Sequence, residues 1–224
     1  MATKRISRLS DPKISQVLDK LHERADEHDA VVIPEVLTAA GERGASTDSE
    51  MADLLAGAFM PIHPNAGRLL HLLAMSRPQG RIVEFGTSHG LSTIYLAAAI
   101  GSDESPVITT EMELSKIDLA LANFEEAGLG DRIDLRVGDA FGTLVDLTDG
   151  IALLFLDGWK GLYLPLLRAL EPRLVPGAIV VADDTLLLPD LCADYVDYVR
   201  SATDLYVSVG LPIDDGLEVS VFLG

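Results

Sequence analysis

Acidic residues follow the apolar runs of this sequence, and three of them could together hold a cation. Asp157 follows "IALLFL", and Asp183 and Asp184 follow "GAIVVA". Because the carboxyl ends of parallel strands meet at one edge of a sheet, we expect these carboxylates to converge. Such carboxylates repel one another unless a cation lies among them, and oxygen ligands suit Mg²⁺ or Ca²⁺. The pattern predicts a metal site at Asp157, Asp183 and Asp184; the alternative is that each Asp caps the segment that follows it.

A lysine lies close to the first of these acids. Lys160 is three positions after Asp157 and should project into the same region. A lysine beside a dication and an apolar wall from Trp159 should have a lowered pKa, which fits a general base. The alternative for Lys160 is a surface salt bridge. Of the histidines, His89 should line a ligand site without doing chemistry, and His63 fits a structural loop residue.

Three other chain segments could bind a nucleoside-like ligand. In "VEFGTSHGLST", Gly86 and Gly90 bracket a loop that lets a ligand approach the backbone near a helix N-terminus, although an ordinary tight turn is equally consistent. Glu111 ends the next run near the offset at which an acid meets a ribose diol, or it is a solvated acid that opens the next helix. Asp139 could accept from an adenine amino group or cap the helix expected near Phe141.

Short apolar runs separated by helix-length segments must position these residues. Five such runs predict a parallel sheet with crossover helices, and two more, "DLYVSVGLP" and "GLEVSVFL", predict a hairpin. The expected fold is therefore α/β, a doubly wound, Rossmann-like, mostly parallel sheet of seven strands with a C-terminal antiparallel hairpin. The five runs cover residues 81–86, 106–111, 132–139, 151–157 and 177–184, and the helices between them begin near Ser92, Glu113, Phe141 and Leu162.

Residues 1–79 read as a helical cap or extension, and residues 80–224 as the sheet domain, together one structural unit. Asp11 is a predicted N-cap with Pro12 at the first helical position, opening a helix over "DPKISQVLDKLHERADEHD". We expect a turn-rich break at 39–50 and helices over "EMADLLAGAFM" and "NAGRLLHLLAMS". The apolar face of residues 50–75 would suit a dimer surface, a lid or simple core packing.

Composition excludes several classes of partner. The formal net charge is -18, from 35 acidic and 17 basic residues, so phosphate backbones and anionic membranes are not attracted. No segment approaches the roughly 20 consecutive apolar residues of a membrane span. Cys192 is the single cysteine and no apolar signal region follows the basic start, so we expect a cytoplasmic protein.

Taken together, these motifs resemble the class I, S-adenosylmethionine-dependent O-methyltransferases of the catechol and caffeoyl-CoA type, over about residues 55 to 224. The resemblance implies S-adenosylmethionine and a divalent cation, Mg²⁺ above others, as cofactors, a small hydroxylated acceptor such as a catechol, and a homodimer. "LDGWKGLY" is similar to the family's segment of metal-binding Asp and catalytic Lys, which makes Lys160 the catalytic residue. The implied cofactor contacts are Met60, Glu84, Gly86, Ser88, His89, Ser92, Glu111, Met112, Asp139, Ala140 and Asp157, and the implied substrate contacts are Trp159 and Glu218.

At Asp184 the chain departs from the family pattern, which has Asn at that position. A second carboxylate strengthens the attraction for a dication but leaves a net negative site. The implied reaction is O-methylation: the cation binds two acceptor oxygens and lowers the pKa of a hydroxyl, and Lys160 removes or neutralises its proton. Trp159 and Met60 would align the oxyanion with the methyl group.

Three other functions remain as alternatives. A metal-independent N- or C-methyltransferase of the same fold would use the Asp residues as caps and charge relays. A nucleoside-binding module without catalysis is disfavoured because a pure binder has no need of repelling carboxylates beside Lys160. A nicotinamide-dependent dehydrogenase fits poorly because the G-x-G-x-x-G loop is missing.

Overall fold

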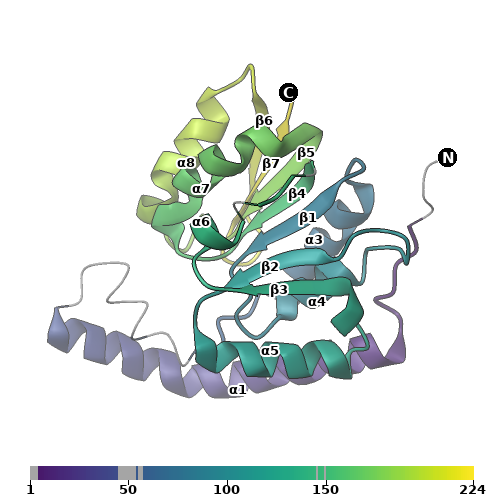
Figure 1. Cartoon of the computed structure of the whole chain (residues 1–224). Helices are drawn as coiled ribbons and strands as arrows, with labels where there is room; N and C mark the ends of the chain where they lie inside the picture. Colours follow the sequence, from purple (N-terminus) through teal and green to yellow (C-terminus); the bar gives the residue numbers. More distant parts are fainter. Residues whose placement is uncertain (1–4, 45–53, 55–57, 145, 149) are drawn as a thin grey trace.

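The computed structural model describes residues 5–44, 54, 58–144, 146–148 and 150–224. Its centre is a sheet of seven strands in the order β3-β2-β1-β4-β5-β7-β6 (Figure 1). The first five strands in this order run parallel, and β7 is antiparallel to both β5 and β6. The strands are β1 (Arg81–Phe85), β2 (Val107–Glu111), β3 (Ile133–Val137), β4 (Ile151–Leu156), β5 (Leu174–Ala182), β6 (Tyr206–Leu211) and β7 (Leu217–Phe222). The predicted fold class and C-terminal hairpin are confirmed.

Helices cover both faces of this sheet (Figure 1). Alternation along β4 divides the core: Phe155 packs in the cluster on one face, and Leu154 packs in the cluster on the other. The first face carries α1 (Pro12–Arg43), α3 (Pro64–Ser76), α4 (Leu91–Ala97) and α5 (Leu114–Glu126), and the second carries α6 (Ala140–Thr143), α7 (Tyr163–Leu170) and α8 (Pro189–Ser201). Both faces are apolar and covered, as a parallel sheet requires.

Helix α1 begins as the sequence predicts and ends later. The Asp11 carboxylate caps it by accepting from the Lys13 N–H at 3.1 Å. The predicted break at 39–50 is wrong for residues 39–43, which are still helical. Gly44 then ends the helix in the left-handed conformation, with a φ of 65°. The Gly inside "AAGER" is tolerated within a helix at about 1 kcal/mol. Residues 45–53 lie outside the described part of the chain.

The helix predicted over 50–60 is wrong at its described end. Residues 58–60 are neither helix nor strand, and residues 50–53 and 55–57 lie outside the description. Met60 has a φ of 44° and precedes Pro61, which disfavours the helical conformation in the residue before it. The next predicted helix is confirmed as α3.

Across the described residues, no helix combines the length and apolar character that crossing a membrane requires.

Candidate active site

The carboxyl ends of β1, β4 and β5 lie side by side. The backbone ladder continues past the strands, since Asp157 N–H donates to the Phe85 carbonyl at 2.9 Å and Asp183 N–H donates to the Leu156 carbonyl at 3.0 Å. Gly86 has a φ of 100°, and a Cβ built on it would lie 2.5 Å from the Asp157 carbonyl oxygen. Only glycine therefore allows the loop after β1 to pack this closely on the end of β4.

Lys160 lies among the carboxylates at these strand ends. Its Nζ is 2.6 Å from Asp184 Oδ2 and 3.5 Å from Asp157 Oδ1, and 9% of the residue is exposed. The Asp184 backbone N–H donates to Asp183 Oδ1 at 2.8 Å, which joins the third carboxylate to the group. The Lys160 ammonium also lies 5.3 Å from the centre of the Tyr163 ring. The structure thus brings the predicted lysine and the three predicted acids to one place.

The groups that surround Lys160 in the structure set its pKa, and the lowered pKa expected beside a dication stays a prediction. Burial lowers the pKa of this ammonium, but the Tyr163 oxygen and the Asp157 and Asp184 carboxylates outweigh it and raise the pKa well above its usual range. Burial also raises the pKa of Asp157 well above its usual range, and it raises the pKa of Asp183 to about 7, with the Asp184 charge adding to it. Lys160 in this arrangement is a held cation, not a free base.

The chemistry of this donor set fits a hard dication, since three carboxylates offer only oxygen ligands. Their present arrangement is a paired one: over the described chain, no group of three acidic, histidine or cysteine side chains is placed to hold a metal ion. The Lys160 ammonium instead lies between Asp157 and Asp184. A metal at this site would have to compete with that ammonium for carboxylate oxygens.

Glu84 on β1 is wholly buried beneath the glycine loop. Its Oε2 accepts from the hydroxyls of Thr93, on α4, and Thr109, on β2, at 2.5 and 2.6 Å. Its Oε1 has no hydrogen-bond partner among the described residues. Burial raises the pKa of Glu84 to about 7, against the effect of the hydroxyl donors. An unpaired buried carboxylate oxygen is a site for an incoming donor such as an amino group.

Glu111 is held by backbone N–H groups at the end of β2. Its Oε1 accepts from Met112 N and Glu113 N at 2.9 and 2.8 Å, and its Oε2 accepts from Ser88 N at 2.7 Å. The Met112 side chain is 63% exposed. The glycine loop and the end of β2 are therefore joined through one carboxylate, whose remaining lone pairs stay available to ligand hydroxyls.

His89 in the glycine loop is buried and uncharged. Its ring stacks on Phe59 at 3.8 Å between centroids, and its carbonyl accepts from Asn123 Nδ2 at 2.9 Å. Burial, together with the neighbouring Lys116 charge, lowers the pKa of His89 to about 4. The ring therefore packs as a neutral wall at physiological pH, and the expectation that it does no chemistry stays a prediction.

The remaining predicted site residues differ in burial and in the contacts that they make. Asp139 caps α6 by accepting from Phe141 N at 2.8 Å, so the cap interpretation describes its contact in the structure. Glu218 is buried on β7 and accepts from Arg200 at 2.9 and 2.6 Å and from Ser208 at 2.5 Å. These bonds tie the Glu218 carboxylate to α8 and β6, and across the sheet Glu218 pairs with Ala182, the residue before Asp183. Ser92 and Ala140 are buried, Trp159 is half-buried at the start of the turn Lys160–Leu162, and Met60 is 43% exposed.

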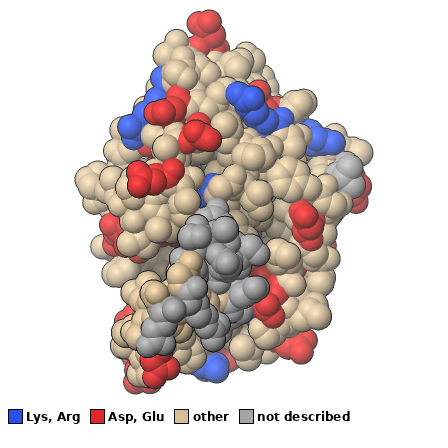
Figure 2. Space-filling view, turned by 90° about the vertical axis from the view of Figure 1, so that its left-hand side faces the viewer, with Lys and Arg blue, Asp and Glu red and all other residues tan. Residues whose placement is uncertain are grey.

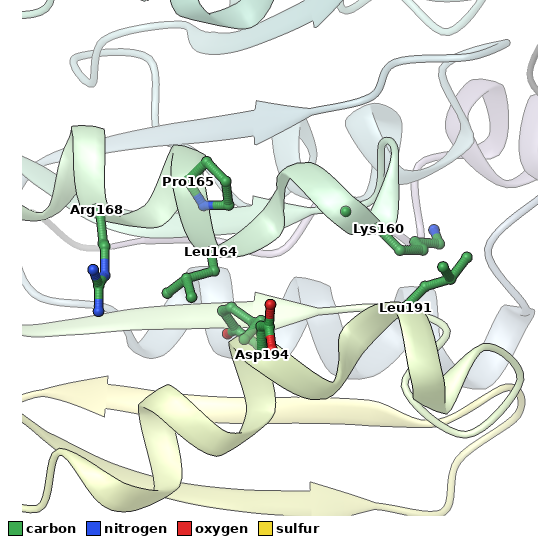
Figure 3. A pocket seen from close by; sticks show the side chains of 8 residues that line it. Lys160, Leu164, Pro165, Arg168, Leu191 and Asp194 are labelled. Atoms are coloured by element: carbon green, nitrogen blue, oxygen red, sulfur yellow. The ribbon is translucent and has the colours of Figure 1, made fainter. Parts of the chain in front are cut away.

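A pocket of about 320 Å³ adjoins Lys160 between α7 and α8. Figure 3 shows Lys160 and Leu191 at one end of it and Arg168 at the other, with Asp194 between them.

On the face shown in Figure 2, Asp and Glu side chains are dispersed, and Lys and Arg of the described residues form no continuous patch.

One residue that sequence reasoning missed is Asp29 on α1. Its carboxylate is 8% exposed and accepts from the backbone N–H groups of Phe59 and Met60 at 2.9 and 2.7 Å. An acid at a buried position of an amphipathic helix was the available signal, since such residues are rarely buried unpaired.

Comparison with known proteins finds similar chains. Residues 83–185 match the family model described as a methyltransferase domain. The catechol O-methyltransferase of Mycobacterium tuberculosis is 33% identical over 121 residues, covering 54% of each chain. That of Niastella koreensis is 32% identical over 139 residues, covering 59% of this chain and 62% of the relative. The chain thus matches between half and two thirds of these relatives' length.

A solved structure extends the likeness to three dimensions. The O-methyltransferase TomG of Streptomyces achromogenes superposes with a TM-score of 0.66 at 26% identity, covering 74% of this chain and 82% of that one, and its structure is a complex with S-adenosylmethionine. The resemblance stated from the sequence motifs is confirmed by these matches.

Proposed function

We propose that this chain, which contains a methyltransferase domain at residues 83–185 and resembles the catechol O-methyltransferases, transfers the methyl group of S-adenosylmethionine to a hydroxyl of a small acceptor. The observation that carries the proposal is the position of Lys160. Its buried ammonium lies among carboxylates at the end of β4, directly beside the glycine loop that follows β1. That arrangement puts a fixed positive charge where an acceptor oxygen would become negative.

The cofactor would bind across the ends of β1 and β2. The unpaired Oε1 of Glu84 suits the amino group of the methionine portion, and Glu111 suits the ribose hydroxyls. Ser88, His89, Ser92 and the backbone at Gly86 would line the same loop, with Met112, Asp139 and Ala140 toward the adenine. When bound, S-adenosylmethionine supplies a methyl group made electrophilic by its sulfonium.

Lys160 would act on the acceptor as a cation. Its ion pairs with Asp157 and Asp184 keep the ammonium charged, so it would stabilise the acceptor oxyanion electrostatically, and the hydroxyl proton would pass to solvent water. Trp159 and Met60 would form apolar walls that direct the oxygen toward the methyl carbon. The oxygen–carbon bond forms as the carbon–sulfur bond breaks, and S-adenosylhomocysteine leaves.

A divalent cation, Mg²⁺ above others, belongs to the proposal as an assisting group. Asp157, Asp183 and Asp184 would hold it, and its chemistry would be to lower the pKa of the acceptor hydroxyl. Two neighbouring hydroxyls, as in a catechol, would suit such an ion. The acceptor class, homodimerisation, a cytoplasmic location and the division at residue 79 stay predictions of the same kind.

A second candidate is metal-independent methyl transfer by the same fold to a nitrogen or carbon. The observation that favours it is the ion pair of 2.6 Å between Lys160 and Asp184, which already neutralises one carboxylate. Rates measured after dialysis against a chelator and after Mg²⁺ is restored separate the two candidates. The first predicts loss and recovery of activity, and the second predicts neither.

Calorimetric titration with S-adenosylhomocysteine tests the main proposal, with NAD as the control ligand. We expect one-site binding of S-adenosylhomocysteine and none of NAD, because the loop after β1 lacks the dinucleotide pattern. A protein that binds neither ligand would contradict the cofactor roles of Glu84 and Glu111, and the proposed reaction with them.

A further inference from the structure

Helix α1 lies outside the matched methyltransferase domain, yet one of its side chains fixes a segment beside the glycine loop. Asp29 Oδ1 accepts from Phe59 N at 2.9 Å, and Asp29 Oδ2 accepts from Met60 N at 2.7 Å. The His28 ring Nδ1 lies 3.0 Å from the same Oδ1. Both carboxylate oxygens are therefore engaged, and two backbone N–H groups that belong to no helix or strand are satisfied.

The segment that Asp29 holds is conformationally unfavourable by itself. Met60 has a φ of 44°, in the left-handed region that residues with a Cβ rarely occupy. Such a conformation persists only where the surrounding contacts enforce it. Phe59 is 5% exposed, and the guanidinium of Arg24, also on α1, lies 5.3 Å from its ring centre. Helix α1 thus supplies both the anchor and part of the cover for residues 58–60.

From this segment, contacts continue into the glycine loop. The Phe59 carbonyl accepts from Ser88 Oγ at 3.0 Å, and the Phe59 ring stacks on His89 with an interplanar angle of 13°. Ser88 N in turn donates to Glu111 at 2.7 Å. One connected set of contacts therefore runs from Asp29 through residues 58–60 and the glycine loop to the end of β2.

We propose that Asp29 is a positioning residue of the cofactor site, acting through Phe59 and Met60 on Ser88 and His89. This inference rests on the proposed function, since it takes the glycine loop to be where S-adenosylmethionine binds. Asp29 touches no reacting atom. It makes helix α1 a working part of the site, although residues 12–43 lie outside the matched domain.

The test compares Asp29→Asn with Asp26→Asn. Both remove one negative charge from α1, but Asp26 is exposed and accepts from no backbone N–H of residues 58–60. Asn keeps the size of Asp29 but replaces one acceptor oxygen by a donor. Amide hydrogen exchange is measured without ligand, and affinity for S-adenosylhomocysteine is measured by calorimetry.

We expect the amides of Phe59 and Met60 in Asp29→Asn to exchange about tenfold faster, and the affinity to fall about tenfold, as for a lost charged hydrogen bond. The amides of β1 and β4 should keep their protection, and Asp26→Asn should match wild type in both measurements. Unchanged exchange at residues 59 and 60, or faster exchange with full affinity, would overturn the proposal. Exchange raised equally throughout the sheet would overturn it too, because Asp29 would then serve general stability.

Two further results keep the outcomes distinct. If Asp29→Asn does not fold, Phe59→Leu removes the stack on His89 while leaving the backbone bonds to Asp29. It should lower affinity with exchange at residues 59 and 60 unchanged, and wild-type affinity would overturn the proposed route through Phe59. A wild-type protein that binds no S-adenosylhomocysteine would contradict the proposed function and the cofactor role of Asp29, while the exchange measurement would still decide whether Asp29 holds residues 58–60.

Discussion

The two halves of the candidate site balance their charges in different ways. At the cofactor half, Glu84 and Glu111 are held by neutral donors, threonine hydroxyls for the first and backbone N–H groups for the second. At the acceptor half, the carboxylates of Asp157 and Asp184 share the ammonium of Lys160, and Asp183 accepts from the Asp184 backbone N–H. The first half is organised by the protein alone. The second is organised around one side-chain cation, so it should respond strongly to the loss of that cation.

The largest effect should come from Lys160→Ala, which removes the cation from the acceptor half. Methyl transfer should slow by about 10² to 10³-fold, the range for losing one electrostatic stabiliser of a developing oxyanion. Affinity for S-adenosylhomocysteine should stay within about twofold, because the cofactor half is untouched. Single-turnover rates and calorimetry provide the two readouts.

The matched control is Lys20→Ala, which breaks the surface pair of Lys20 with Glu126. It should leave both measurements at the wild-type value, since such exposed pairs contribute little. If Lys160→Ala lost affinity for S-adenosylhomocysteine by the same factor as its rate, the assignment of Lys160 to the acceptor half alone would be contradicted.

Glu84→Gln changes the cofactor half, and its effect is on stability. Burial raises the pKa of Glu84 from 4.5 to about 7, so the folded protein holds this proton more tightly than the unfolded chain does. The Glu84 contribution to stability is therefore fully present below pH 4.5 and is lost as the pH rises through about 7. Glutamine removes this dependence, and we expect the variant to gain about 2 kcal/mol on wild type between about pH 5.5 and about pH 8.

Urea unfolding at the two pH values measures this difference, in a range above the isoelectric point near 4.4. Glu113→Gln is the control, because that acid is not buried and its pKa is lowered by accepting from Ser115 N. It should change the pH dependence slightly and in the opposite direction. A Glu84→Gln variant with the wild-type dependence would mean that Glu84 is solvated in the folded protein.

Asp184→Asn should have the smallest effect on rate and the clearest effect on metal preference. It removes the 2.6 Å partner of Lys160 and restores the Asp-Asn pattern of the family. We expect activity within about tenfold of wild type, because a carbonyl oxygen still offers a ligand. The ratio of rates with Mg²⁺ and with Ca²⁺ should shift. A loss as large as that of Lys160→Ala would show that the Asp184 carboxylate itself is required.

The sequence predicted the fold well because the short apolar runs, the helix-length segments between them and the hairpin pattern all indicated the same α/β sheet. Short β-branched runs mark the strands, and the rule that parallel strands end at one edge of the sheet predicts that Asp157 lies beside Asp183. The same reasoning did not find the nearest partner of Lys160. Spacing indicated that Asp157 was near, but only the fold shows that Asp184 lies 2.6 Å from the ammonium.

The contacts of Asp29 could not be predicted from the sequence, for a different reason. Its partners are backbone N–H groups of residues 59 and 60, which are far along the chain and carry no side-chain pattern that points back to α1. Contacts of this kind depend on where a loop passes in space, and periodicity does not encode that path. The residues 58–60 were also expected in a helix, where their N–H groups would have had other partners.

Gly86 has a further consequence, for how this protein could diversify. Its missing side chain lets the loop after β1 rest directly on the backbone of Asp157, with no adjustable group between them. If methyl transfer takes place here, the separation of donor and acceptor is set by two main chains. Exchanges of side chains around Lys160 would then alter which molecules are methylated, while the path travelled by the methyl group is inherited unchanged.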